Sequence, residues 1–279
     1  MSEVTQARVL RRSGNPAPVA APAQPPAPTG PNIWESLSAP ATITNLKGVL
    51  FGPPKTKKTL HSLSGGGKKL LVLTEPEGDI VLAGRKDVKV LRPKNFRELN
   101  QIVEGLHGAE GPKWDRVVFD SITFMFEVVG AKEILKVLAA NKDARRQYLN
   151  AGASINQIVH DAVALPMDVI FTAQMAIDRP NEEAGETPLN PEDGEYPLTL
   201  AITPMVYKIL VPAVSFIGRT YKKSGLAKAE GNKPARRVVE YWTSFEDYGK
   251  SPAGSRLLIP EQVKDLNMDE LLATIKKEA

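Results

Sequence analysis

Residues 52–59 combine the residue types of a phosphate-binding loop and directly follow a short apolar segment, residues 49–51. The usual pattern is G-x-x-x-x-G-K-[ST], in which backbone amides surround the β-phosphate, the Lys neutralises the β and γ oxygens and the hydroxyl reaches Mg²⁺. Gly52, Lys58 and Thr59 occupy three of the four fixed positions, and Lys57 stands where the second Gly belongs. We expect the whole loop to bind a nucleotide, through Gly52, Pro53, Pro54, Lys55, Thr56, Lys57, Lys58 and Thr59.

Three polar residues that end apolar segments could supply the rest of a phosphoryl-transfer site, which needs an acid to organise Mg²⁺ and a group to align water. Asp120 could reach the metal through its water shell, beside the Thr59 hydroxyl, or else cap the following helix. Glu75 could polarise the attacking water, or belong only to an acidic turn. Gln174 could sense the γ-phosphate and pass its state to the following loop, or simply face that loop.

The composition sets limits on the class of protein. The 279 residues are 42% hydrophobic and 24% charged, the balance of a globular protein with a sizeable core. The chain has no Cys, which excludes disulfides and thiol catalysis, and we expect an intracellular, cytoplasmic protein. The net charge of +4 is compatible with a polyanionic partner. No apolar run approaches the roughly 20 residues that span a bilayer, so we expect no membrane partner.

The first 40 residues differ from the remainder in composition. They contain 8 of the 23 prolines, interleaved with Ala. Proline lacks an amide donor and fixes φ, which favours an extended, solvated arm without a core. We therefore expect two parts, a disordered or partner-binding arm over residues 1–40 and a folded domain over residues 41–279.

Strand-like and helix-like segments alternate through the second part, which predicts an α/β fold with a mostly parallel sheet flanked by helices. The strands are expected at residues 46–51, 70–74, 88–91, 116–120, 169–174, 211–217 and 237–242. The helices are expected within 57–63, at 96–106, at 122–140, in a segment that ends near 166, and at 268–277. The apolar residues of 96–106 recur at the spacing of one helical face.

The ordered set of motifs resembles the RecA-like P-loop ATPase core, in particular a phage-encoded nucleotide-binding family of the AAA type that includes RecA-like single-strand annealing proteins. The resemblance spans about residues 44–260 and rests on residues 52–59, 74–75, 117–121, 147–150 before a helix, 169–174, 216–219, 249–251 and Arg256.

The resemblance implies roles for single residues. Lys58 and Thr59 would bind the phosphates of ATP and Mg²⁺, Asp120 would support the metal, Glu75 would be the catalytic carboxylate, and Gln174 would be the sensor. It also implies a homo-oligomer, either a ring or a filament, in which Lys250 or Arg256 of a neighbouring subunit completes the site. A solvated surface charge is the alternative for both.

Single-stranded DNA is the polyanion that the resemblance suggests. The segment after Gln174 is acidic, however, and acidic loops repel phosphate backbones. A later basic segment includes Tyr221 as a possible stacking residue, although a solvated basic hairpin would have the same composition. The candidate nucleic-acid contacts are Arg145, Arg146, Arg219, Tyr221, Lys222, Lys223, Arg236 and Arg237.

The leading hypothesis is an ATPase that acts in phage DNA recombination, replication or repair, in the host cytoplasm. The alternative is an adaptor that binds a nucleotide, DNA or a replication or recombination partner protein without turnover, because Lys57 departs from the loop pattern. A small-metabolite kinase is a third hypothesis, but no Arg-rich lid is visible in the sequence. Retained ATP affinity after Lys58→Ala would contradict the first hypothesis.

Overall fold

The computed structural model describes residues 45–76, 80–126, 144–177, 198–227, 236–246 and 251–278, all of which belong to the unit Ile43–Ala279. The expected arm at residues 1–40 lies outside the described residues. The elements are β1 (Lys47–Gly52), α1 (Lys58–Ser62), β2 (Lys69–Leu73), η2 (Ile80–Leu82), β3 (Val88–Leu91), α2 (Phe96–His107), η3 (Gly111–Lys113), β4 (Arg116–Asp120), α3 (Ile122–Phe124), α5 (Ala144–Val163), β5 (Asp168–Ile177), β6 (Leu198–Leu200), α6 (Pro204–Ala213), β7 (Phe216–Ala227), β8 (Arg236–Ser244), β9 (Gly254–Ser255), β10 (Gln262–Lys264) and α7 (Met268–Glu278).

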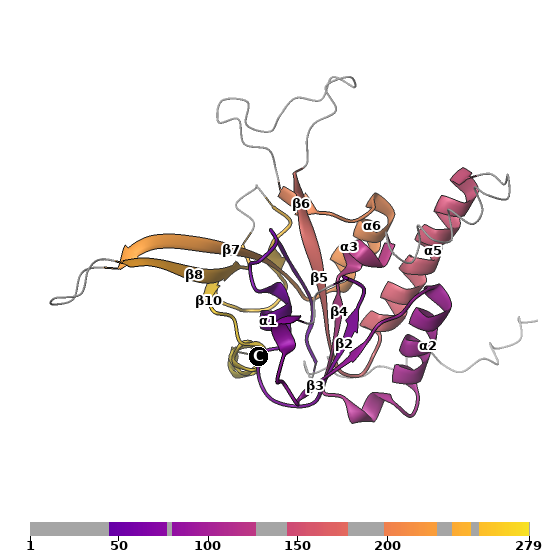
Figure 1. The fold of residues 1–279 in the computed structure, drawn as a ribbon, viewed down its shortest axis with the longest axis horizontal. Helices are drawn as coiled ribbons and strands as arrows, with labels where there is room; N and C mark the ends of the chain where they lie inside the picture. Colours follow the sequence, from indigo (N-terminus) through magenta and orange to yellow (C-terminus); the bar gives the residue numbers. More distant parts are fainter. Residues whose placement is uncertain are drawn as a thin grey trace, which may run out of the picture. The chain divides into compact units, whose positions relative to one another are not determined.

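The strands form one ten-stranded sheet in the order β10-β8-β7-β1-β5-β4-β2-β3, with β6 beside β5 and β9 beside β7. The strands from β7 to β3 in this order are parallel, whereas β6, β8, β9 and β10 pair antiparallel. The predicted α/β architecture, a mostly parallel sheet flanked by helices, is thereby confirmed (Figure 1).

Alternate residues of the central strands face two separate apolar layers. Val49 and Phe51 of β1 belong to the layer that α2, α5 and α6 cover, and Leu50 belongs to the layer that receives Leu271 and Ile275 of α7. Both sheet faces are therefore buried, which explains why these strands are nearly continuous apolar runs in the sequence.

The parallel strands bring their carboxyl ends to one edge of the sheet. The register pairs Gly52 with Gln174 and Leu73 with Asp120, so the phosphate-binding loop, Glu75 and Asp120 all begin at this edge. Ligands of open α/β sheets bind at the carboxyl ends of the strands. The strand register therefore places the predicted site residues at one edge of the sheet.

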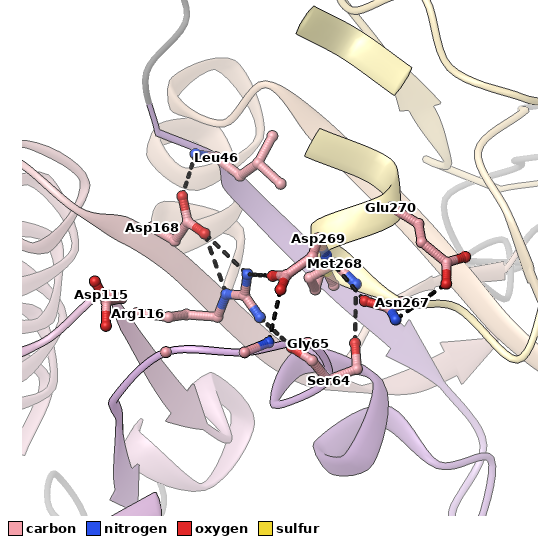
Figure 2. A network of polar contacts seen from close by, with 12 residues as sticks. Leu46, Ser64, Gly65, Asp115, Arg116, Asp168, Asn267, Met268, Asp269 and Glu270 are labelled. Carbon is pink, nitrogen blue, oxygen red and sulfur yellow. Dashed lines mark hydrogen bonds and ion pairs between the residues drawn. The ribbon is translucent and has the colours of Figure 1, made fainter. Parts of the chain in front are cut away.

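The opposite edge of the sheet is closed by an ion-pair network around the buried Arg116, which Figure 2 shows. The Arg116 guanidinium of β4 lies 3.0 Å from Asp168 of β5 and 3.1 Å from Asp269 of α7. Asp168 also accepts a hydrogen bond of 2.8 Å from the Leu46 amide, and Asp269 accepts one of 2.6 Å from the Gly66 amide. These contacts fix the carboxyl-terminal helix and the segment after α1 to the sheet.

The structure corrects two expectations about local structure. The strand expected at residues 211–217 begins only at Phe216, because residues 211–213 end α6 and residues 214–215 connect the two elements. Thr203 caps this helix by accepting from the Val206 amide, and Pro204 occupies its first turn. A short apolar run cannot be assigned to helix or strand by periodicity alone. Residues 147–150 lie inside α5 rather than before a helix, and most of the helix expected at 122–140 lies outside the described residues.

Candidate functional site

The loop between β1 and α1 begins at a glycine that the packing requires. A Cβ atom at Gly52 would lie 2.3 Å from the Thr220 carbonyl oxygen of the adjacent strand β7. The Thr56 hydroxyl is 2.7 Å from the Thr220 hydroxyl and donates to the Pro53 carbonyl at 2.8 Å. The base of the loop is therefore held against β7 on one side.

Lys57 takes the backbone conformation that its position in the pattern demands. Its φ of 64° and ψ of 22° are left-handed, a region that costs a non-glycine residue roughly 1–2 kcal/mol. The ammonium group lies 3.1 Å from Asp265 and 3.9 Å from the centroid of the Tyr241 ring. These contacts direct the long side chain away from Gly52 and toward β8 and the segment after β10.

Lys58 lies at the centre of the loop with its ammonium group turned inward. It donates hydrogen bonds of 2.9 Å to the carbonyls of Gly52 and Pro53 and one of 3.3 Å to Gln174 Oε1. The side chain is buried, and burial lowers the pKa of the ammonium group, which the charges of Glu75 and Asp120 partly oppose. The loop thus presents a desolvated cation that is held by weak neutral acceptors.

Asp120 receives hydroxyl donors from two different elements. Thr59 of α1 donates to Oδ2 at 2.6 Å, and Thr172 of β5 donates to Oδ1. Asp120 is only 2% exposed, and burial raises the pKa of its carboxyl group, while the two hydroxyl donors act in the opposite direction.

The oxygen groups of Thr59 and Asp120 fit a magnesium ion that also takes phosphate ligands. Mg²⁺ prefers oxygen and is commonly held by one or two carboxylates together with substrate phosphates. Within the described part of the chain, no cluster of three or more His, Cys, Asp or Glu could hold a metal by itself. A cation at this place would therefore depend on the phosphates of a ligand.

Gln174 connects the cation of the loop to the expected catalytic carboxylate. Its Nε2 donates to Glu75 Oε1 at 3.0 Å while its Oε1 accepts from Lys58. Its backbone amide donates to the Thr123 hydroxyl at 3.0 Å, and its carbonyl accepts from the Ala201 amide at 2.8 Å. One residue therefore contacts the loop, the carboxylate and the start of the segment after β6.

These residues surround a cleft of about 730 Å³, a size within the range of ligand sites. The structure brings together the predicted loop, Glu75, Asp120 and Gln174, and it adds Tyr241 of β8, which the sequence analysis did not select. Thr172 was missed as well. The signal for Thr172 was a hydroxyl two positions before Gln174, on the same side of the strand, whereas nothing local in the sequence points to Tyr241.

Of the two residues expected to act from a neighbouring subunit, one lies away from the cleft and the other lies outside the described residues. Arg256 follows β9, is exposed, and donates to the Pro212 carbonyl at 2.7 Å, and it is not among the residues that line the cleft. Lys250 and the acidic segment 178–197 lie outside the described residues. Arg145 and Arg146 fall in the first turn of α5.

The hairpin of β7 and β8 divides the predicted basic segment between two faces. The register pairs Tyr221 with Trp242 and Lys222 with Tyr241, so Tyr221 and Lys222 point to opposite sides. One face, here called the outer face, carries Arg219, Tyr221, Lys223 and Trp242. The Lys223 ammonium group lies 4.2 Å from the Trp242 ring centroid and 5.5 Å from that of Tyr221.

The other face of the hairpin, here called the inner face, turns toward the phosphate-binding loop. It carries Thr220, Lys222 and Tyr241, together with Arg237, which is paired with Leu226. Arg236 begins β8. β1 pairs only with residues 216–219 of β7, so the rest of the hairpin extends beyond the end of β1. In Figure 1 this part of the hairpin projects away from the parallel strands.

Comparisons with known proteins add little to this geometry. No family profile and no curated protein matches the sequence. Among solved structures, a RadB recombinase is 16% identical and covers 73% of this chain and 89% of its own, with a TM-score of 0.38. The flagellar accessory protein FlaH of Methanocaldococcus jannaschii is 13% identical, covering 78% and 83%, with a TM-score of 0.33. A KaiC-like protein of Pyrococcus horikoshii OT3 is 12% identical, covering 71% and 78%, also at 0.33.

Because these TM-scores are all below 0.5, the similarities support no statement about function. The fold is established by the strand order described above. None of the helices in the described part of the chain is long and apolar enough to cross a bilayer.

Proposed function

We propose that this protein binds ATP with Mg²⁺ at residues 52–59 and hydrolyses the bond between the β- and γ-phosphates. The observation that carries the proposal is the convergence of Lys58, the Thr59–Asp120 pair and the Gln174–Glu75 pair on one cleft. Phosphoryl transfer requires a cation for the phosphates, oxygen groups for the metal and a carboxylate for the water, which Lys58, the Thr59–Asp120 pair and Glu75 would supply.

Each group has a distinct task in the proposed reaction. Lys58 leaves the carbonyls of Gly52 and Pro53 and neutralises the β and γ oxygens, which are far stronger acceptors. Thr59 and Asp120 would hold Mg²⁺, Asp120 through a water molecule, and the metal would supply positive charge for the phosphates. Glu75 aligns a water molecule and accepts its proton while the water oxygen attacks the γ-phosphorus. The bond from the γ-phosphorus to the bridging oxygen breaks, and the products are ADP and inorganic phosphate.

Gln174 is proposed to sense the γ-phosphate. A phosphate beside Lys58 competes with Gln174 Oε1 for the ammonium group, and the amide then keeps only its contact with Glu75. The backbone bonds from Gln174 to Thr123 and Ala201 offer a route from this change to residues 178–203. The nucleotide state would thus reach the segment that follows β5.

One part of the proposal rests on the resemblance of the motifs. It is a role in phage DNA recombination, replication or repair, in the cytoplasm of the host cell. Single-stranded DNA is the proposed partner, and the outer face of the β7–β8 hairpin is its best-supported contact, because Arg219 and Lys223 lie beside the rings of Tyr221 and Trp242. Aromatic rings interleaved with cations bind unpaired bases by stacking. The same proposal includes a homo-oligomeric ring or filament, in which Lys250 or Arg256 of a neighbouring subunit completes the site. It also includes a replication or recombination partner protein and a separate arm at residues 1–40.

The competing function is an adaptor that binds nucleotide without turnover. Lys57 favours it, because its left-handed backbone and its tether to Asp265 make this loop stiffer and more cationic than one with glycine. Tight binding of a product-like anion slows release and therefore turnover.

ATP turnover with and without single-stranded DNA separates the two functions. We expect turnover in the wild type, its loss in Glu75→Gln with ATP affinity kept, and no change in Glu104→Gln, which alters an exposed carboxylate on α2. Tight ATP binding without turnover in the wild type would support the adaptor instead.

A further inference from the structure

The cleft at the phosphate-binding loop has two chemically different ends, and consecutive lysines point to them. Lys58 contacts Gln174 and thereby faces Glu75, whereas Lys57 contacts Tyr241 and Asp265. The first end is polar and carries the carboxylates. At the second end Tyr241 is the aromatic ring among the described residues that line the cleft.

The Tyr241 ring is held in a fixed place. Its backbone is paired with Lys222 of β7, and its carbonyl accepts a hydrogen bond of 2.8 Å from the Asp265 amide on the opposite side. The Lys57 ammonium group, itself bound to Asp265, rests 3.9 Å from the ring centroid. The ring is half-buried rather than covered, so part of it faces the cleft.

We propose that the base of the bound nucleotide stacks against the Tyr241 ring, which makes Tyr241 the residue that recognises the nucleoside. The inference rests on the proposed nucleotide-binding function. If the γ-phosphate lies between Lys58 and Glu75 and the metal lies at Thr59, the nucleoside extends toward the other end of the cleft. A planar base and an aromatic ring stack favourably whatever the identity of the base.

The chemistry of this end also predicts how selective the site is. The amide and the carboxylates that line the cleft, Gln174, Glu75 and Asp120, are all engaged around Lys58 and Thr59. The cleft side chain in contact with Tyr241 is Lys57, whose ammonium group is engaged by Asp265 and by the Tyr241 ring rather than offered to a base edge. Stacking favours the larger ring system, so purine nucleotides should bind more tightly than pyrimidine nucleotides.

The test compares ATP with inorganic tripolyphosphate, which has the phosphates but lacks the nucleoside. Dissociation constants for both, with Mg²⁺, are measured by isothermal titration calorimetry on the full chain. Tyr241→Ala should weaken ATP binding by about 5- to 100-fold, the range of base–aromatic stacking, and leave tripolyphosphate binding unchanged. The preference for ATP over UTP should narrow in the same variant.

Three further variants make the result specific. Tyr241→Phe should bind ATP as the wild type does, because stacking uses the ring and not the hydroxyl. Tyr241→Leu keeps a branched apolar side chain larger than that of alanine and should lose ATP affinity as Tyr241→Ala does, which guards against a folding defect in the alanine variant. Val239→Ala, at an exposed position of the same hairpin, should leave both constants unchanged.

Two results would overturn the base contact while leaving the nucleotide site standing. One is unchanged ATP affinity in Tyr241→Ala and Tyr241→Leu. The other is an equal loss of ATP and tripolyphosphate binding, which would mean general damage to the cleft. A wild-type protein that binds neither ligand would instead overturn the proposed function, and the base contact with it.

Discussion

The Thr59 hydroxyl donates a hydrogen bond of 2.6 Å to Asp120 Oδ2, which joins the first turn of α1 to the end of β4 across 61 residues of chain. The hydroxyl proton is used in this bond, so the lone pairs of the Thr59 oxygen are left to face the cleft. A hydroxyl oriented in this way is ready to coordinate a cation. Asp120 thus has a positioning role in addition to any contact through water.

Asp120→Asn should separate the stability of the fold from metal-dependent binding. Because burial raises the pKa of Asp120 above its ordinary value of 3.8, the folded protein binds the carboxyl proton more tightly than the unfolded chain does. The folded state therefore loses stability as the pH rises from 3.8 through the pKa of the folded protein. The neutral amide removes this cost. We expect an equal or higher melting temperature without ligand at pH 7, but loss of the additional stabilisation that Mg²⁺ gives to the ATP complex.

The measurement is differential scanning fluorimetry with ATP in Mg²⁺ or in EDTA. A matched control is Asp161→Asn, an acidic residue of α5 away from the cleft, which should keep the Mg²⁺-dependent shift. A variant of Asp120 that keeps the full shift would show that this carboxylate does not support the metal.

Lys58→Ala should abolish measurable ATP binding. Truncating one partner of a desolvated charge pair costs about 2–5 kcal/mol, and here the phosphates would lose their buried cation. Calorimetric titration of ATP provides the measurement, with Lys86→Ala as a control at an exposed lysine outside the cleft. ATP affinity that survives in Lys58→Ala, with the fold intact by circular dichroism, would contradict the assignment.

His61→Leu should reduce the sensitivity of the fold to acid. His61 of α1 is buried, and neither ring nitrogen has a hydrogen-bond partner among the described residues. Burial, assisted by the charge of Lys57, lowers the pKa of His61 from 6.5 to about 4, so the unfolded chain binds this proton first. Stability is therefore lost as pH falls from 6.5 toward 4, by about 2 kcal/mol at pH 5.

Urea unfolding at pH 7 and pH 5 measures this difference. The variant should lose about 2 kcal/mol less than the wild type between the two pH values. His160→Leu, at an exposed position of α5, should behave as the wild type does. Equal losses in His61→Leu and the wild type would show that His61 is not the group responsible.

The outer face of the β7–β8 hairpin should carry the contact with single-stranded DNA. Tyr221→Ala with Lys223→Ala removes a ring and a cation from this face, whereas Lys222→Ala removes a cation from the inner face. Fluorescence anisotropy with a labelled oligonucleotide should show weaker binding for the double variant, and a salt slope that falls by about 0.7 for the lost lysine. A larger effect of Lys222→Ala would assign the contact to the other face.

The sequence was most informative where an apolar run ended in a polar residue. Glu75 follows and Asp120 ends a buried strand, Gln174 comes directly after the buried part of β5, and parallel strands bring such positions to one edge. The strand order supplied the rest, because β5 lies between β1 and β4 and places Thr172 against Asp120.

Tyr241 could not be predicted, because its place depends on the register of a hairpin whose strands are antiparallel to one another. A shift of one residue would turn Trp242 toward the loop and Tyr241 away from it. The same reason explains why the basic segment appeared as one cluster in the sequence and is divided between two faces in the fold. The end of α6 was mistaken for the start of a strand, because residues 211–217 form one short, mostly apolar run that periodicity alone does not assign.

A structure of the full chain with Mg²⁺ and a non-hydrolysable ATP analogue tests the central claim most directly. We expect a triphosphate within residues 52–59 and a Lys58 ammonium group that has left the carbonyls of Gly52 and Pro53 for the β and γ oxygens. An empty loop at saturating analogue, with Lys58 still bound to those two carbonyls, would contradict it.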